Sequence, residues 1–311
     1  MSSSSPFQAP RGRAGFTLVE MLVALVITAL LTTVIWQLVR TQSRFVAFES
    51  QREDAQANGR AAVDIVAGDV RAALPQGIIS AKDSVLVLAL PKAWGVLCAT
   101  NTAISMTAVF PTMAPDAFTV LANGGTGVVV NTAATSTPIW LPRPALDNTR
   151  ATVTAIAAAN AAAVCTTATG TVSAYTLTGT NFPIGAAGTL VSLYQLVRYD
   201  VGQSEGKWWV RRSNGINADN TFSMVPLAGP VFARDSMRFT YYTGAAATLA
   251  NPAPGTAVAT LDQLSRVKFK VVTVSSGAYG GTSSVNRDST TILLRNRVRP
   301  LSCAVGAPAP C

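Results

Sequence analysis

Glu20 is the one ionisable side chain in a long apolar stretch, so its chemistry needs an explanation before any other. The stretch covers residues 16–39, and a helix needs about 20 residues to cross a bilayer. A charged side chain at membrane depth costs about 2.5–3.5 kcal/mol on insertion scales. A carboxylate kept at this position therefore implies a role that offsets that cost.

The motifs that suggest enzymatic chemistry fail on inspection. The 311 residues contain no histidine, which removes Ser-His-Asp triads, Cys-His dyads and histidine-based zinc sites. GQSEG at residues 202–206 matches the G-x-S-x-G pattern of hydrolases, but it lies between two strand-like segments and has no histidine base. NGINADN at residues 214–220 holds a single acid, so a solvated turn is favoured over a calcium loop. The sequence predicts that the chain is not an enzyme and holds no cofactor or metal.

The basic balance of the chain raises the question of a nucleic-acid partner. The net charge is +9, and aromatic and basic residues occur together in KWWVRR at residues 207–212, a pattern compatible with single-stranded nucleic acid. Neighbouring residues of a strand point to opposite faces, so only about half of this set can face one ligand. Core and sheet-surface roles are favoured for these side chains, and nucleic acid is kept only as an alternative partner.

A long helix must position Glu20. The chain from residue 40 onward is rich in helix formers and has no proline until Pro75. Aliphatic residues recur at three- and four-residue steps and predict a buried stripe, formed by Val63, Val66, Val70 and Leu74. Charged residues fall away from that stripe, namely Arg60, Asp64 and Arg71. A helix over residues 17–74 would be about 90 Å long if straight, with a bend favoured near Asn58 and Gly59.

The second half of that helix needs a sheet to cover its stripe. Segments with strand character occur at residues 84–91, 188–201, 207–213, 231–243, 264–275 and 289–298. Alternation is clearest in RVKFKV, residues 266–271, where the three cations face opposite to the apolar residues. GQSEG reads as a hairpin connection. Residues 93–187 read as a low-complexity insertion of loops and short strands. The low charge content, 13%, suits a β-rich exported domain.

The segment before the apolar stretch decides between two kinds of membrane signal. It is polar and Ser-rich and carries Arg11 and Arg13, while Arg40 and Arg44 follow the stretch. The flanking charges therefore give no decisive orientation. The apolar stretch is too long for an ordinary secretory signal, and no A-x-A site closes it. From these features alone the segment is a single-pass signal anchor.

The sequence GFTLVEMLVAL resembles the class III signal of type IV pilins and pseudopilins. The resemblance implies that a prepilin peptidase cuts after Gly15 on the cytoplasmic side and methylates the new amino terminus at Phe16. Glu20 is then the fifth residue of the mature chain, which in this family pairs with the terminal amine of a neighbouring subunit. At ~4 Å and an effective dielectric constant near 20, such a pair is worth roughly 4 kcal/mol, comparable to the insertion cost.

Later segments narrow the resemblance. Several segments are similar to parts of PilW-type minor pilins and of J-type pseudopilins. They are QANGRAAVDIVAGDVRAA, YQLVRYDV, WWVRRSN, VPLAGPVFARDSMRFTYYTGAA and TTILLRNRV. Gly68 departs from the family, which often has arginine there. The length of the chain favours the PilW type, because the J-type pseudopilin is usually shorter. The insertion at residues 93–187 resembles no family segment.

The resemblance implies an α+β, pilin-like fold in which a long N-terminal helix, its first half transmembrane, packs on an antiparallel β-sheet. The expected divisions are a leader at residues 1–15, a transmembrane and assembly half-helix at 16–39, a periplasmic half-helix at 40–75 and a globular domain at 76–311. The expected function is that of a minor pilin that primes a type IV pilus near its tip. The alternatives are a J-type pseudopilin of type II secretion, or a tip adhesin or DNA-uptake subunit.

The resemblance also sets the expected partners and location. The partners are the prepilin peptidase, other minor pilins, the major pilin and the inner membrane. The protein is expected to be a single-pass inner-membrane protein with a periplasmic globular domain before it joins the pilus at the cell surface.

Four cysteines lie beyond the apolar segment, on the side that a pilin exposes to the oxidising periplasm. They are Cys98, Cys165, Cys303 and Cys311, and three pairings are open to them. Cys98–Cys165 and Cys303–Cys311 are favoured because each pair brackets a poorly structured run. The alternative is that some are free and buried as small hydrophobic residues.

Overall fold

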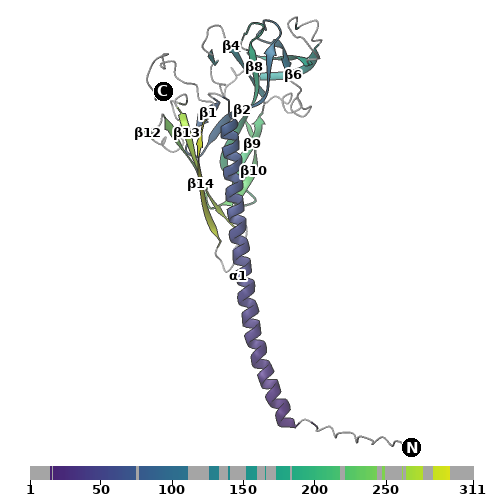
Figure 1. Ribbon diagram of the computed structural model, residues 1–311, viewed down its shortest axis with the longest axis vertical. Coiled ribbons are helices and arrows are strands. Elements are labelled where there is room, and N and C mark those ends of the chain that lie inside the picture. The colour runs from purple at the N-terminus through teal and green to yellow at the C-terminus, as the bar shows by residue number, and fades with distance from the viewer. Residues whose placement is uncertain are drawn as a thin grey trace, which may run out of the picture. The chain divides into compact units, whose positions relative to one another are not determined.

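The computed structural model contains one long helix and an extended antiparallel sheet (Figure 1). It describes residues 15, 17–74, 77–110, 126–132, 139–140, 152–159, 165, 173–182, 184–217, 221–243, 247–248, 261, 264–275 and 283–294. The chain divides into two compact units, residues 1–50 and 51–311. The α+β class expected from the sequence is confirmed.

The helix α1 covers Leu18–Ala72, close to the expected bounds. It continues without interruption through Asn58 and Gly59, where the sequence favoured a bend. The reason lies in packing, because Gly59 is buried against the sheet. A Cβ added to Gly59 would lie 2.9 Å from Asn286 Nδ2 and 3.1 Å from Thr273 Oγ1. This glycine therefore permits a close approach of helix and sheet.

The part of α1 in the first unit is exposed along its apolar length, including Leu18, Leu25 and Trp36. It is long and apolar enough to cross a membrane. Its threonine hydroxyls do not need water, because Thr28 and Thr32 each donate a hydrogen bond to the carbonyl oxygen four residues earlier, both at 2.7 Å. These hydroxyl groups are in this way satisfied inside the helix, as a lipid environment requires.

The part of α1 in the second unit has the predicted buried stripe. Val63, Val66 and Val70 are buried, and Leu74 is partly buried. The charged residues that the sequence placed away from the stripe are exposed, namely Arg60, Asp64 and Arg71. The stripe packs against the sheet in one apolar cluster that includes Phe239 and Phe269, whose ring centroids lie 5.1 Å apart. The prediction of a sheet-covered helix face is confirmed.

Among the described residues the sheet has fourteen strands, and all of their pairings are antiparallel. The strands are β1 Ile78–Ala81, β2 Leu86–Leu97, β3 Ser105–Phe110, β4 Thr126–Thr132, β5 Ile139–Trp140, β6 Thr152–Ala159, β7 Ser173–Thr180, β8 Leu190–Ser204, β9 Lys207–Ile216, β10 Phe222–Val231, β11 Met237–Thr243, β12 Ala247–Thr248, β13 Leu264–Val274 and β14 Val285–Leu293. The order is β1-β2-β3-β7-β6-β4-β8-β9-β10-β13-β11-β12; β14 also pairs with β13, β5 with β4, and β2 with β8.

Two strand predictions need correction. The segment predicted as one strand over residues 231–243 is the end of β10, a turn and then β11. The turn forms because the Ser236 hydroxyl accepts a hydrogen bond from the Ala233 amide at 2.7 Å. The strand predicted at residues 84–91 continues to Leu97, past a register shift between Pro91 and Ala93.

The hairpin predicted at GQSEG is confirmed. Strands β8 and β9 pair up to Ser204 and Lys207, so the connection is the two residues Glu205 and Gly206. Both have positive φ angles, 52° and 74°, which is the backbone conformation of a type I′ hairpin turn. Ser204 is therefore the last residue of a strand in a hairpin, and not a nucleophile at the start of a helix.

The insertion at residues 93–187 contributes strands to the same sheet. Strands β3, β6 and β7 pair with one another and with β2. Together with residues of β2 and β8 they form a second apolar cluster, which includes Phe110, Leu177 and Leu193. The expectation of loops and short strands is correct for the described part, but the sequence did not predict a separate core.

Candidate processing and assembly site

The start of α1 carries a reciprocal pair of hydrogen bonds between Thr17 and Glu20. The Thr17 amide donates to Glu20 Oε2 at 3.0 Å, and the Thr17 hydroxyl donates to the same oxygen at 3.1 Å. The Glu20 amide in turn donates to the Thr17 hydroxyl oxygen at 3.3 Å. This is a capping box, in which the residue before the helix and the third helical residue satisfy amides that have no partner inside the helix.

The capping box gives Glu20 a defined position. A negative charge in the first turn interacts favourably with the positive end of the helix dipole, and the carboxylate is directed back over the Thr17 amide. The structure thus holds the carboxylate on the amide of Thr17, the residue that follows Phe16 in the sequence. Phe16 itself lies outside the described residues.

Gly15 lies outside the helix and is exposed, and a Cβ added to it would meet nothing within 4 Å. The expected scissile bond is therefore outside α1, with the capping residue Thr17 between it and the first helical residue. Removal of residues 1–15 would leave the cap intact.

Thr17 is a site residue that the sequence reasoning missed. The signal was present, because T-x-x-E followed by an apolar run is the sequence pattern of a capping box. The carboxylate of Glu20 stands out as a charge in an apolar segment, whereas the uncharged Thr17 does not.

The N-terminal segment also matches a known family. Residues 10–36 match the family described as the prokaryotic N-terminal methylation motif. No curated protein and no solved structure matches the chain. The motif and the long apolar N-terminal helix support a type IV pilin-like protein, and the antiparallel sheet fits that arrangement. The motif marks the chain as a prepilin-type substrate, which implies processing by a prepilin peptidase and assembly with other pilins.

A second group of side chains ties α1 to the sheet. Arg212 lies 2.9 Å from the Asp69 carboxylate, and its Nε donates to the Tyr199 hydroxyl oxygen at 3.1 Å. The Tyr199 hydroxyl donates to Asp69. Burial, together with the negative charge of Asp69, raises the pKa of Tyr199 well above its ordinary value. The hydroxyl thus stays protonated and serves as a donor.

The pairing of β9 with β8 also accounts for the basic stretch at residues 207–212. Arg211 lies 2.9 Å from Asp200, which also lies 3.1 Å from Arg198. Trp209 donates its indole N–H to the Ser204 carbonyl oxygen at 3.2 Å. With Arg212 bound to Asp69, both arginines of this stretch have carboxylate partners, so they are not available as a phosphate-binding pair.

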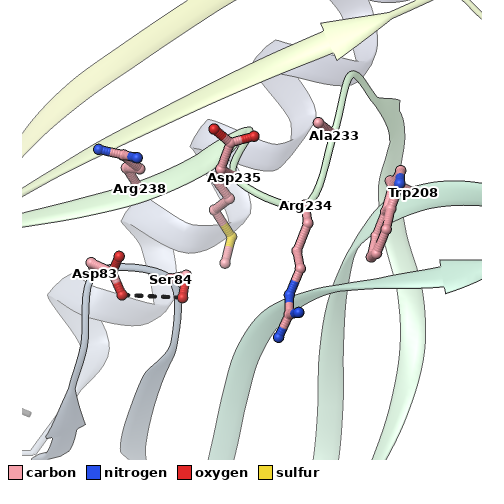
Figure 2. A pocket seen from close by; sticks show the side chains of 8 residues that line it. Asp83, Ser84, Trp208, Ala233, Arg234, Asp235 and Arg238 are labelled. Atoms are coloured by element: carbon pink, nitrogen blue, oxygen red, sulfur yellow. Dashed lines mark hydrogen bonds between the residues drawn. The ribbon is translucent and has the colours of Figure 1, made fainter. Parts of the chain in front are cut away.

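A surface pocket of about 600 Å³ lies beside Trp208 (Figure 2). Its charged lining residues are Asp83, Arg234, Asp235 and Arg238. The Ser84 hydroxyl donates to the Asp83 carboxylate at 3.2 Å. Two carboxylates and two guanidinium groups give the lining of this pocket no excess of formal charge of either sign.

The structure joins Cys98 to Cys165 by a disulfide, the pairing that the sequence analysis favoured. Their Cα atoms lie 4.5 Å apart, and both residues are buried with Ala174. Cys303 and Cys311 lie outside the described residues, as do residues 218–220 of the NGINADN segment.

Proposed function

We propose that this chain is a minor subunit of a type IV pilus, of the PilW type, that helps to prime the filament near its tip. The observation that carries the proposal is the Glu20 carboxylate held over the helix start inside a methylation motif. In this proposal the prepilin peptidase cuts between Gly15 and Phe16. Glu20 then pairs with the amine of a neighbouring subunit, and the partners are other minor pilins and the major pilin.

The proposal includes a location and a class. The protein is held in the inner membrane by α1 before assembly, with its globular unit in the periplasm, and later lies at the cell surface. It acts as a structural subunit and not as an enzyme. The exposed apolar length of α1 supports the location in a membrane and then in a filament, because such a helix needs lipid or other helices around it.

The processing step is tested with Gly15→Val. The site has room for the new side chain, so the variant should fold and insert normally but keep its leader and stay out of filaments. N-terminal sequencing of the wild-type and variant chains gives the result. An assembled wild-type chain that still begins at Met1 would contradict the proposal.

A gene deletion separates the pilus from a type II secretion pseudopilus, which uses the same N-terminal chemistry. The proposal expects loss of twitching motility with normal release of exoproteins. Loss of exoprotein release with normal twitching would assign the chain to the pseudopilus instead.

A further inference from the structure

Strand β14, Val285–Leu293, forms a long edge of the sheet (Figure 1). Each of its residues is paired with β13 without a register shift, and among the described residues no strand lies on its other side, which we call the free edge. The other strands with a single described neighbour are short, since β1 has four residues and β5 and β12 have two each. A long, regular edge without proline is a template for a further strand.

The hydrogen bonds beyond the two ends of β14 show which of its backbone groups point outward. The Ser275 amide donates to the Ser284 carbonyl oxygen at 2.9 Å, and the Leu294 amide donates to the Ser265 carbonyl oxygen at 3.0 Å. Even-numbered residues therefore bond to β13, because the backbone groups of successive residues in a strand point to opposite sides. The amides and carbonyls at the free edge belong to the odd-numbered residues, Val285, Arg287, Ser289, Thr291 and Leu293.

One of the outward amides already has a partner within the strand. The Ser289 amide donates to Asp288 Oδ1 at 2.8 Å, and a charged residue on an edge discourages unwanted strand pairing. An incoming strand that offers a carbonyl oxygen to Ser289 releases this carboxylate. A basic residue opposite Asp288 on the incoming strand would then bind the released charge. The free edge is in this way selective for strands with a cation at that position.

A second copy of this chain does not fit the free edge. A symmetric pair of copies, the commonest form of homodimer, would join β14 to β14 as antiparallel strands. Such a pair opposes odd-numbered residues to odd-numbered residues, so Asp288 of one copy is never opposite Arg287 of the other. Its two-fold axis is perpendicular to the sheet and reverses the direction of α1, whose buried stripe packs on the sheet face. Subunits that share one membrane have their helices in one direction, so this pairing is excluded.

We propose that the free edge of β14 takes up an extended segment of a different pilin-type subunit as an added strand of the sheet. The methylation motif implies assembly with other pilins, and a sheet edge is recognised by main-chain hydrogen bonds together with side chains at alternate positions. The matching segment has a basic residue opposite Asp288 and an apolar residue beside Leu293, which is 64% exposed. The inference rests on the proposed role as a filament subunit, and it holds for a pilus or a pseudopilus.

The first test compares Thr291→Pro with Thr291→Val. Thr291 is exposed and its amide faces the free edge, so proline removes no hydrogen bond to β13 but removes one donor from the edge and places its ring in the path of an incoming strand. Valine keeps the amide and favours a strand. The loss of one or two hydrogen bonds should lower the share of the proline variant in sheared filaments by about five- to tenfold, whereas the valine variant should match the wild type.

The second test identifies the partner. The photo-crosslinking residue p-benzoylphenylalanine replaces Thr291 in cells that assemble filaments, and mass spectrometry identifies the peptide that it captures. The expected product joins position 291 to one segment of another pilin-type subunit. The control position is Lys92, which is exposed on β2 and should not give this product. Thermal midpoints of the full chains in detergent show whether each variant folds.

Several results would overturn the inference. Equal incorporation of Thr291→Pro and Thr291→Val would show that no strand is added at the edge. A crosslink to residues 295–311 of the same chain would show that its own C-terminal segment is the occupant, and a crosslink to a second copy would show self-association. If Thr291→Pro does not fold, the crosslink decides, and its absence refutes the inference. Absence of the wild-type chain from filaments would overturn the filament role itself, and the inference with it.

Discussion

The carboxylate of Asp69 on α1 lies 2.9 Å from the guanidinium of Arg212 on β9. Both side chains are about four-fifths buried, and the Tyr199 hydroxyl donates to the same carboxylate. One polar group of the helix is therefore bound to two adjacent strands of the sheet, beside the apolar stripe. Apolar packing alone would leave the helix free to shift along the sheet, whereas this contact fixes one register.

Asp69→Asn should destabilise the globular unit by about 2–3 kcal/mol, because it removes a charged acceptor and leaves the Arg212 guanidinium without its carboxylate. The matched control is Asp64→Asn, an exposed carboxylate five residues earlier on the same helix, with an expected change within about 0.5 kcal/mol. Urea unfolding of the full chain in detergent measures both. Equal effects of the two substitutions would show that the Asp69 contact has no special weight.

Two tyrosines should make the fold sensitive to alkali. Burial raises the pKa of Tyr199, and of Tyr241, whose hydroxyl donates to the Lys82 carbonyl oxygen. Below about pH 10 these hydroxyls are protonated in both the folded and unfolded states. Above it the unfolded chain loses the protons and the folded chain keeps them, so the free energy of unfolding falls by about 1.4 kcal/mol per pH unit for each tyrosine. Unfolding at pH 9, 10 and 11 should show this loss, with a shallower slope in Tyr241→Phe.

The two helix glycines should respond in opposite directions to alanine. Gly68 is exposed with open space around it, so Gly68→Ala should stabilise the helix by about 0.5–1 kcal/mol. Gly59→Ala places a methyl group 3.1 Å from Thr273 Oγ1, and that hydroxyl is held in place by its hydrogen bond to the Ala55 carbonyl oxygen. The second variant should lose the helix-propensity gain and become less stable than the wild type. The thermal midpoint of each variant measures the effect. An equal rise of the midpoint in both variants would contradict the close approach of helix and sheet at Gly59.

Glu20→Gln separates two roles of the same side chain. Glutamine can replace glutamate in a capping box, so the hydrogen bonds with Thr17 should persist while the negative charge is lost. If the charge pairs with the amine of a neighbouring subunit, this variant should be processed and stable but enter filaments poorly. Thr17→Val is the matched control, because it weakens the cap and keeps the charge. Immunoblots of sheared filaments measure incorporation, and normal incorporation of Glu20→Gln would refute the pairing.

Features that depend on local periodicity could be predicted from the sequence. The Val63 stripe, the alternation around Phe269 and the turn at Glu205 each follow from side chains within a few residues of one another. The strand β10 was missed because Pro226 and Pro230 argue against a strand.

Features that depend on the tertiary register could not be predicted. Nothing near Asp69 in the sequence identifies Arg212 as its partner, since the contact exists only after the helix and β9 have docked. The second apolar cluster was hidden in the same way, because its residues come from strands far apart in the sequence, both in the low-complexity insertion and in β8.

The Cys98–Cys165 bond changes how the globular unit responds to a pulling force. A load passing along the chain crosses this bond and bypasses the backbone between the two cysteines, which are 67 residues apart. At about 3.3–3.6 Å per extended residue, roughly 220–240 Å of chain is removed from the length that tension can draw out. Strands β3, β4, β5 and β6 all lie within that loop. Their segment of the chain is thereby shielded from stretching for as long as the cystine is intact, and chemical reduction would lengthen the unit under load by that amount.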